Sequence, residues 1–182
     1  LGSGLTGFEL MWDSYYSKVL EVLPNLSSPF QESHAYYLLV EYKDNDQNLG
    51  AERFESALFA QLESGLIDDA LIAQSHQDAD KFWQIRDGIG ELFQVLGPVS
   101  NQDVSLPLEQ IGPFAEDLDQ RLKAKYDNIG VLLFGHIGDN NLHVCAYTGR
   151  DEDKLKINED IMHMIGEYSG AITAEHGVGV IK

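Results

Sequence analysis

The sequence is poor in cysteine and in positive charge. Cys145 is the single cysteine, so no disulfide can form within the chain. Twelve lysines and arginines stand against thirty aspartates and glutamates, which gives a formal net charge of -18. Such a surface repels phosphate backbones and anionic lipid headgroups, so we expect neither nucleic acid nor a lipid surface as a partner. An anionic substrate would have to be captured by local positive charge.

Long apolar runs are also missing. The run at 131–134 is far shorter than the ~20 residues of a membrane-spanning helix. The chain begins without the charged and then apolar leader of secreted proteins. We therefore expect no integral membrane segment and a cytoplasmic protein, with membrane-peripheral attachment as the alternative. Repeats, low-complexity tracts and proline-rich linkers are absent too, which predicts that residues 1–182 form a single domain.

What the sequence does contain is an alternation of helix and strand patterns. Apolar residues at helical spacing predict helices at 8–23, 49–63, 76–93, 107–126 and 151–168. Runs rich in aromatic and β-branched residues predict strands at 35–42, 70–73, 102–106, 131–135, 142–147 and 171–174. One link between strands is a tight hairpin, so the sheet should be antiparallel or mixed. We expect an α+β plait in which helices back the sheet.

That hairpin carries the densest group of reactive side chains, Gly-His-Ile-Gly-Asp-Asn-Asn-Leu-His at 135–143. If Asp139 and Asn140 are the two central turn residues, His136 directly faces His143. Directly opposed side chains share one face, with Cβ atoms ~5 Å apart, so the two imidazoles could hold one cation. The alternative is a pair of cross-strand histidines without a metal, because the register of such turns slips easily.

A second group is Ala-Glu-His-Gly-Val-Gly at 174–179. Glu175 could complete a His/His/Glu set, which suits zinc with one position open for substrate. His176 could serve as a base near neutral pH. A glycine-rich turn with solvated polar groups is the alternative.

A third feature is Arg86, one of the few cations, which lies one helical turn after Trp83. A guanidinium is the best bidentate partner for a carboxylate, so Arg86 is a candidate substrate-binding residue. A surface salt bridge with a neighbouring aspartate is the commoner role of such an arginine.

Together these motifs resemble the C-terminal domain of FAD-linked oxidases of the vanillyl-alcohol oxidase superfamily. The subgroup that they resemble most contains D-lactate, D-2-hydroxyglutarate and glycolate dehydrogenases. Phe-Glu-Leu-Met at 8–11 and Ser-Leu-Pro at 105–107 match as well, so the resemblance runs in order along almost the whole chain. It implies a ferredoxin-like plait that covers a flavin ring.

The resemblance also implies that FAD is bound mainly by a separate N-terminal domain. We therefore expect residues 1–182 to be a fragment that lacks this domain and an extreme C-terminal segment, and to be inactive alone. A homodimer is a further expectation, and the electron acceptor is not indicated.

The resemblance further implies a reaction, the oxidation of a D-2-hydroxy acid to the 2-keto acid. Arg86 would pair with the C1 carboxylate of the substrate. A divalent metal, zinc in particular, on His136, His143 and Glu175 would lower the pKa of the 2-hydroxyl. His176 would take the hydroxyl proton while hydride leaves C2 for the flavin.

Other positions are implied to contact the cofactor or the substrate. The implied cofactor-binding residues are Asn141, Glu175 and Gly177. The implied substrate-binding residues are Arg86, Asn101, His136 and His143.

Departures from the family pattern affect the choice of substrate. Asn101 stands where 2-hydroxyglutarate-type members carry lysine, Gly90 where they carry threonine, and Cys145 where many carry asparagine. A second substrate carboxylate would find no charged partner at Asn101 or Gly90, which favours a monoacid such as D-lactate. Two other classes stay open. One is a transferase of the alkyl-dihydroxyacetone-phosphate synthase type, and the other is a non-catalytic binding or assembly subunit.

Overall fold

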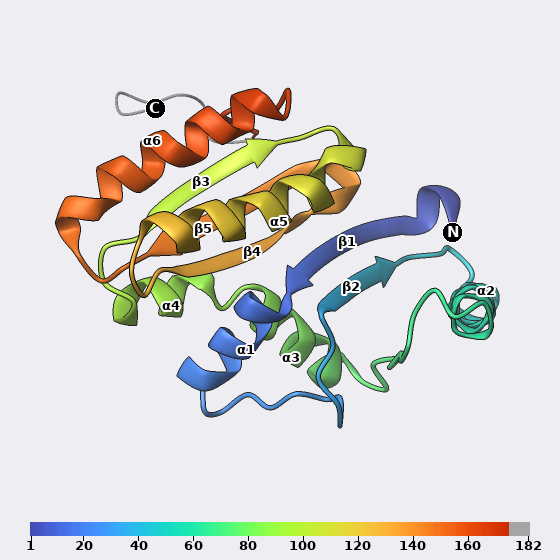
Figure 1. Cartoon of the computed structure of the whole chain (residues 1–182). Coiled ribbons are helices and arrows are strands. Elements are labelled where there is room, and N and C mark those ends of the chain that lie inside the picture. Colours follow the sequence, from blue (N-terminus) through green and yellow to red (C-terminus); the bar gives the residue numbers. More distant parts are fainter. Residues whose placement is uncertain (175–182) are drawn as a thin grey trace.

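The computed structural model describes residues 1–174, which form a five-stranded sheet between two layers of helices (Figure 1). The strand order is β2-β1-β4-β5-β3, and each neighbouring pair is antiparallel. The strands are β1 Leu5–Trp12, β2 Tyr36–Tyr42, β3 Ser100–Ser105, β4 Gly130–His136 and β5 Asn141–Tyr147. The expected α+β plait is confirmed, and the antiparallel type is the one that these strands form.

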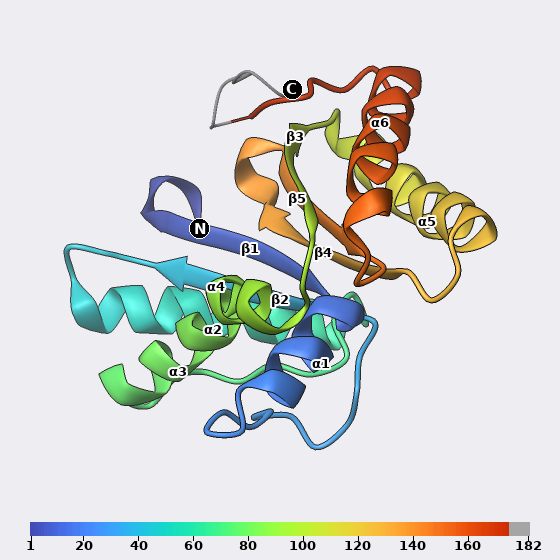
Figure 2. The same ribbon diagram turned by 90° about the vertical axis from the view of Figure 1, so that its left-hand side faces the viewer.

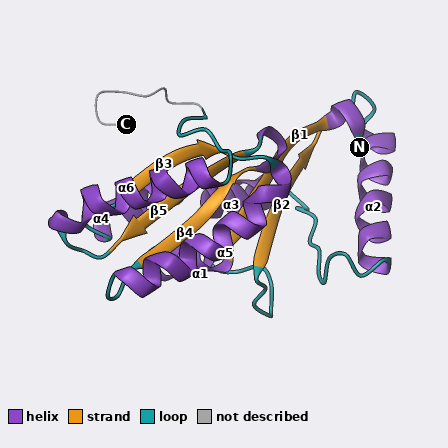
Figure 3. Cartoon of the chain, turned by 45° about the horizontal axis from the view of Figure 1, so that its top comes forward, coloured by secondary structure: helices purple, strands orange, loops and turns teal. Residues whose placement is uncertain are grey.

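Helices cover the two faces of the sheet unequally (Figure 2). One face carries α5 Leu108–Lys125 and α6 Asp151–Glu167. The opposite face carries α1 Asp13–Val22, α3 His76–Arg86 and α4 Ile89–Val95. Helix α2 Gln47–Glu63 stands apart from both layers, beside the end of the sheet formed by β1 and β2 (Figure 3). Two short 3-10 turns, η1 Gly2–Gly4 and η2 Ile137–Asp139, complete the elements.

The face under α5 and α6 is an apolar core. Alternate residues of β4 and β5 point into it, because successive side chains of a strand lie on opposite faces. They meet helix residues such as Phe114, Leu118 and Ile161, each with 0% of its surface exposed. Burying a large apolar side chain contributes roughly 1.5–3 kcal/mol, so this layer stabilises the sheet.

The opposite face holds a smaller core with polar side chains beside it. Tyr15 of α1 stacks on Phe134 of β4 with ring centroids 4.2 Å apart. The Tyr15 hydroxyl donates a hydrogen bond of 2.6 Å to the backbone oxygen of Arg86. Helix α1 therefore fixes the last residue of α3 against the sheet.

The helix expected over 8–23 is wrong in its first part. Residues 5–12 form β1, and α1 begins only at Asp13. The spacing of apolar residues in this stretch fits a helix as well as a strand, but β1 pairs with β2 on one side and with β4 on the other. Pairing on both edges satisfies the backbone of these residues in a way that local spacing does not reveal.

The helix expected over 76–93 divides at Gly88, where α3 ends and α4 begins. A Cβ atom at Gly88 would lie 2.7 Å from Cγ1 of Val19, so glycine lets the junction approach α1 closely. The strands expected at 70–73 and 171–174 are also wrong. The first stretch is irregular, and the second makes a single bridge between Ala171 and Ser105. The remaining expected elements are confirmed within a few residues.

Candidate functional site

The β4–β5 hairpin brings its two histidines together, but in a different register from the expected one. Phe134, not His136, lies directly opposite His143. The connection is longer than two residues, because η2 is followed by Asn140 in the left-handed region at φ 58°. The prediction of a two-residue turn is therefore wrong.

The slip of two residues preserves the shared face, because side-chain direction alternates with a period of two. His136 and His143 lie diagonally on the face that α1, α3 and α4 cover. Their ring centroids are 5.4 Å apart, with the ring planes at 79°. The two imidazoles therefore lie close together on one face, as expected, although they form a diagonal pair and do not face each other directly.

His136, with 32% of its side chain exposed, contacts the buried ion pair of Glu9 and Arg86. Glu9 of β1 lies opposite His136 in the β1–β4 register, and its Oε1 is 2.8 Å from His136 Nδ1. The other oxygen, Oε2, accepts a hydrogen bond of 2.8 Å from Arg86 Nε. Arg86 Nη2 lies against both nitrogens of the His136 ring, 3.0 Å from Nε2 and 3.3 Å from Nδ1. Glu9 and Arg86 are 4% and 7% exposed, so water screens these charges poorly.

Arg86 is held from several directions at the end of α3. Its guanidinium carbon lies 5.3 Å from the centre of the Phe134 ring, and Nη1 donates to Asp87 at 3.2 Å. Tyr15 binds its backbone oxygen. The arginine expected to bind a carboxylate is therefore a buried cation beside His136, and it also makes the salt bridge with a neighbouring aspartate, Asp87, that the alternative interpretation expects.

His143 has a carboxylate beside it as well. Asp103 of β3 lies opposite His143 in the β3–β5 register, with Oδ1 3.6 Å from His143 Nδ1. Asp103 is 4% exposed. Asn141 precedes His143 by two residues on β5, so it shares this face, and it is buried.

Asn101 of β3 and Cys145 of β5 are partners in the same register, two residues away from Asp103 and His143. Asn101 is exposed, and its Oδ1 accepts a hydrogen bond of 3.2 Å from the Cys145 thiol. Burial raises the pKa of Cys145 to about 12, so the thiol stays protonated at neutral pH. A protonated thiol is a poor metal ligand and a poor nucleophile.

The structure therefore gathers His136, His143, Arg86 and Asn141 on one face, with Asn101 at its edge. The expected positions Glu175, His176 and Gly177 lie outside the described residues. Within residues 1–174 there is no cluster of three or more His, Cys, Asp or Glu side chains that could hold a metal ion. Two imidazoles on one face fit zinc as a donor type, but they supply only two of the donors that a site needs.

Glu9 and Asp103 were not anticipated from the sequence. Their partners are set by which strands lie side by side, whereas the apolar spacing of residues 8–12 predicts a helix where β1 lies. One signal for Glu9 lies in the sequence, because a glutamate within the apolar run Phe-Glu-Leu-Met at 8–11 is almost never fully buried unless it is paired.

Comparison with known proteins decides the family. Residues 2–182 match the family described as FAD linked oxidases, C-terminal domain. The chain belongs to this family. It is 37% identical over 184 residues to the mitochondrial D-2-hydroxyglutarate dehydrogenase of Arabidopsis thaliana, an alignment that covers all of this chain and 32% of the relative.

Two further relatives come from other organisms, and one of them is named for a different hydroxy acid. A D-2-hydroxyglutarate dehydrogenase of Stutzerimonas stutzeri is 30% identical, with 98% of this chain and 39% of the relative covered. A putative mitochondrial D-lactate dehydrogenase of Schizosaccharomyces pombe is 28% identical, with 98% and 36% covered. The chain spans about a third of the length of the curated relatives that it matches.

The structure and these names bear on location only in part. Among residues 1–174, no helix combines the length and the apolar character needed to cross a lipid bilayer. Several relatives carry the word mitochondrial in their names. A cytoplasmic location of this chain stays a prediction.

Proposed function

We propose that this chain forms the substrate-binding part of an FAD-dependent dehydrogenase that oxidises a D-2-hydroxy acid to the 2-keto acid. The observation that carries the proposal is the buried guanidinium of Arg86, with Nη2 3.0 Å from His136 Nε2, on the face that also holds His143. A fixed cation can bind the carboxylate of a substrate, and an imidazole beside it can then contact the neighbouring hydroxyl group. Membership of the family, with relatives named as hydroxy-acid dehydrogenases, supports the same reaction class.

Arg86 is the proposed anchor for the C1 carboxylate. Its guanidinium is planar and permanently charged, which suits two parallel hydrogen bonds to a carboxylate. Glu9 and Asp87 hold Nε and Nη1, so the Nη2 side next to His136 is where a substrate would bind. That placement would set C2 and its hydroxyl above the two histidines.

The redox and metal chemistry would come from bound groups. FAD, held mainly outside this chain, would accept the hydride of C2, and a divalent metal such as zinc would act as a Lewis acid on the 2-hydroxyl. His136, His143 and Glu175 are the proposed metal ligands, and His176 is the proposed acceptor of the hydroxyl proton. Asn141, Glu175 and Gly177 are proposed to lie near the cofactor.

For the substrate we propose a monoacid of the D-lactate type. Asn101 carries no charge and Gly90 offers no side chain, while the carboxylate of Asp103 lies two residues from Asn101 on β3. A second substrate carboxylate beside Asn101 would lie near the like charge of Asp103 and would meet no cation at either position, which disfavours a diacid. D-2-hydroxyglutarate is the second candidate, because several relatives are named for it.

The test compares kcat/KM for D-lactate and D-2-hydroxyglutarate in the complete flavoprotein with a dye as electron acceptor. We expect wild type to prefer D-lactate. Arg86→Ala should lower kcat/KM for both acids by at least about 30-fold, since removing one partner of a buried charge pair costs about 2–5 kcal/mol.

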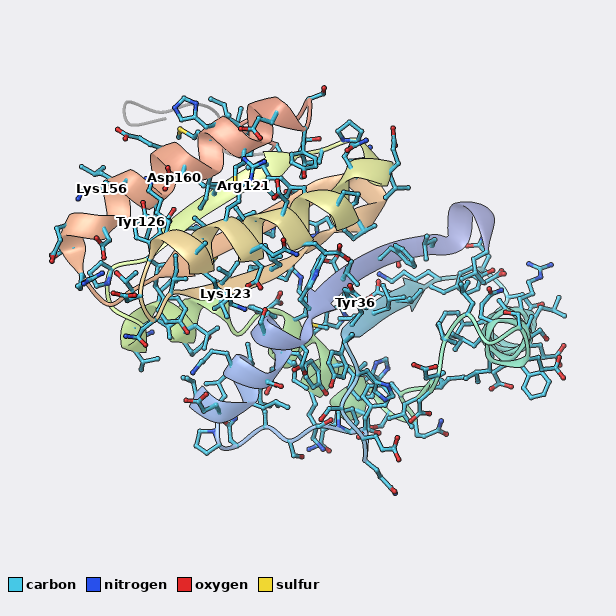
Figure 4. All side chains as sticks on the ribbon, in the orientation of Figure 1. Tyr36, Arg121, Lys123, Tyr126, Lys156 and Asp160 are labelled. Atoms are coloured by element: carbon cyan, nitrogen blue, oxygen red, sulfur yellow. The ribbon has the colours of Figure 1, made fainter. Side chains whose placement is uncertain are left out.

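Arg121→Ala is the matched control. Arg121 lies on α5, on the opposite face of the sheet (Figure 4), and pairs with Asp117 and Glu167 at 2.8 Å each. It should leave kcat/KM unchanged. Retention of kcat/KM within about twofold by Arg86→Ala would refute the carboxylate role, and a clear preference for D-2-hydroxyglutarate would select the diacid.

A further inference from the structure

We infer that Tyr15 is a positioning residue that fixes the backbone of Arg86 and, through it, the place of the guanidinium. The inference rests on the proposed function, because it concerns the arginine proposed there to bind the C1 carboxylate. The starting observation is that Tyr15, with 0% of its surface exposed, places its hydroxyl on the backbone oxygen of Arg86.

Arg86 stands at the end of a helix, where the backbone is held least firmly. It is the last residue of α3, and Asp87 and Gly88 separate α3 from α4. The last carbonyl groups of a helix have no partner within that helix, and helix ends fray. The position of the Arg86 backbone therefore depends on contacts from outside α3.

Helix α1 lies beside α3 and α4 and supplies these contacts (Figure 2). The Tyr15 hydroxyl donates a hydrogen bond of 2.6 Å to the Arg86 oxygen. Burial raises the pKa of Tyr15, so the hydroxyl stays protonated and remains a donor at neutral pH. One turn further along α1, Val19 packs against Gly88, where a Cβ atom would lie 2.7 Å from Val19 Cγ1. Helix α1 thus contacts the junction on both sides of Asp87.

The ring of Tyr15 supports the other end of the same arginine. It stacks on Phe134 with ring centroids 4.2 Å apart and the planes at 21°. The guanidinium carbon of Arg86 lies 5.3 Å from the centre of the Phe134 ring, and a cation is attracted to an aromatic ring. Tyr15 therefore supports the backbone of Arg86 directly and its guanidinium through Phe134, while Glu9 accepts from Nε.

Exact placement matters for a cation that binds a carboxylate. A guanidinium binds a carboxylate through two parallel hydrogen bonds, so the geometry is strict. A displacement of about 1 Å at a positioned group can lower the rate of a reaction by about 10²-fold. Without the Tyr15 hydroxyl, Arg86 keeps its charge and its pairing with Glu9, but its backbone is free to shift. We therefore expect weaker binding of the carboxylate and little change in the chemical step that follows.

Tyr15→Phe in the complete flavoprotein tests the inference, because it removes one oxygen atom and keeps the stack on Phe134. KM for D-lactate should rise by about 3–10-fold, the range expected for one lost hydrogen bond, with kcat within about twofold of wild type. The inhibition constant of pyruvate, the keto product, should rise by the same factor, because pyruvate presents the same carboxylate and does not react.

Tyr16→Phe is the matched control. Tyr16 is the next residue of α1 and is also buried, but its hydroxyl donates to Ser28 Oγ at 3.0 Å. Loss of this hydroxyl weakens α1 without touching Arg86, so KM and the inhibition constant should stay at the wild-type values. An equal rise of KM in both variants would show a general loss of stability and would overturn the positioning role.

Combining Tyr15→Phe with Arg86→Ala shows whether Tyr15 acts through the guanidinium. Residue 86 keeps its backbone oxygen in Arg86→Ala, so the hydrogen bond from Tyr15 can still form while the guanidinium is gone. In that background Tyr15→Phe should change KM by less than about twofold. A rise as large as in the wild-type background would mean that Tyr15 acts by another route, and the inference would be wrong.

Arg86→Ala alone separates the inference from the proposed function. If it leaves KM unchanged, the carboxylate role of Arg86 is wrong, whatever Tyr15 does. If it raises KM while Tyr15→Phe stays within about twofold of wild type, only the positioning role of Tyr15 is wrong.

Gly88→Ala covers the case in which Tyr15→Phe does not fold. The added Cβ atom meets Val19 and pushes the junction away from α1, so KM and the inhibition constant of pyruvate should both rise. Gly112→Ala on α5 is its control, because a Cβ atom there points into open space. A folded Gly88→Ala variant with the KM of Gly112→Ala would refute the dependence of Arg86 on α1.

Discussion

At the scale of single residues, Cys145 shows how burial decides chemistry. Its side chain is 0% exposed beneath α1 and α4, and its thiol donates to Asn101 Oδ1. While it stays protonated, the thiol is a poor metal ligand and a poor nucleophile. Burial raises its pKa to about 12, well above the pH of ordinary assays.

We therefore expect Cys145 to resist alkylation in the native protein. A thiolate is the reactive form, and at pH 8 almost none is present because the pKa is about 12. Iodoacetamide treatment followed by mass spectrometry of the peptide that contains Cys145 should show it unmodified, and modified once guanidinium chloride has unfolded the protein. Rapid native alkylation at pH 8 would contradict the burial on which this rests.

The site residues could be read from the sequence only one by one. Arg86 stands out by type, because lysine and arginine together number only twelve, and His136 and His143 stand out by their positions on the two sides of one turn. Glu9 could not be found in that way among thirty acidic residues. Its importance comes from facing His136 across two strands that are far apart in the sequence, which is a property of the sheet.

At the scale of elements, the β4–β5 hairpin decides whether the histidines meet. Gly135 is the residue on which its close packing depends. A Cβ atom there would collide with the Asn141 backbone oxygen and lie 2.9 Å from Leu142 Cα. Both obstacles belong to the backbone of β5, so no side chain can move aside to relieve the contact.

Gly135→Ala should destabilise the complete protein by about 1–3 kcal/mol and reduce dehydrogenase activity, because β4 must shift and carry His136 with it. Urea unfolding followed by circular dichroism measures the first effect. Gly138→Ala in the same hairpin is the control, since its Cβ would come no closer than 3.8 Å to Phe8 Cβ. Equal midpoints for the two variants would show that the hairpin tolerates the extra atom.

The elements themselves were largely predictable, and the failures have a common cause. The long helices α5 and α6 present one apolar face, so their spacing is informative. The extent of strand β1 and the register of the β4–β5 hairpin depend on pairing with other strands. The spacing of apolar residues does not reveal which strands pair or in which register. The slip by two residues left the shared face intact, which is why the expectation about the histidines survived an incorrect turn.

At the scale of the whole molecule, the sheet separates a large core from a group of buried charges. The face under α5 and α6 is mainly apolar, and the other face carries Glu9, His136, His143, Arg86 and Asp103 beside a smaller core. Each arginine within residues 1–174 pairs with a carboxylate, and for Arg86 the partners are Glu9 and Asp87. Ion pairs join Arg53 to Asp44, Arg121 to Glu167, Lys125 to Asp160 and Arg150 to Asp153.

That charge distribution bears on where FAD is held. The pyrophosphate of the dinucleotide is anionic, so it needs helix N-termini, glycine-rich turns or uncommitted cations. A chain of net charge -18 whose arginines are paired with carboxylates is poorly suited to supply them.

We therefore expect residues 1–182, produced alone and shown by circular dichroism to be folded, to purify without colour and to remain so after incubation with FAD and dialysis. The complete protein, treated in the same way, should show the visible absorption of a flavoprotein. A stoichiometric yellow chromophore on residues 1–182 would mean that this domain binds the dinucleotide itself, and that the polar face of the sheet does more than hold the substrate.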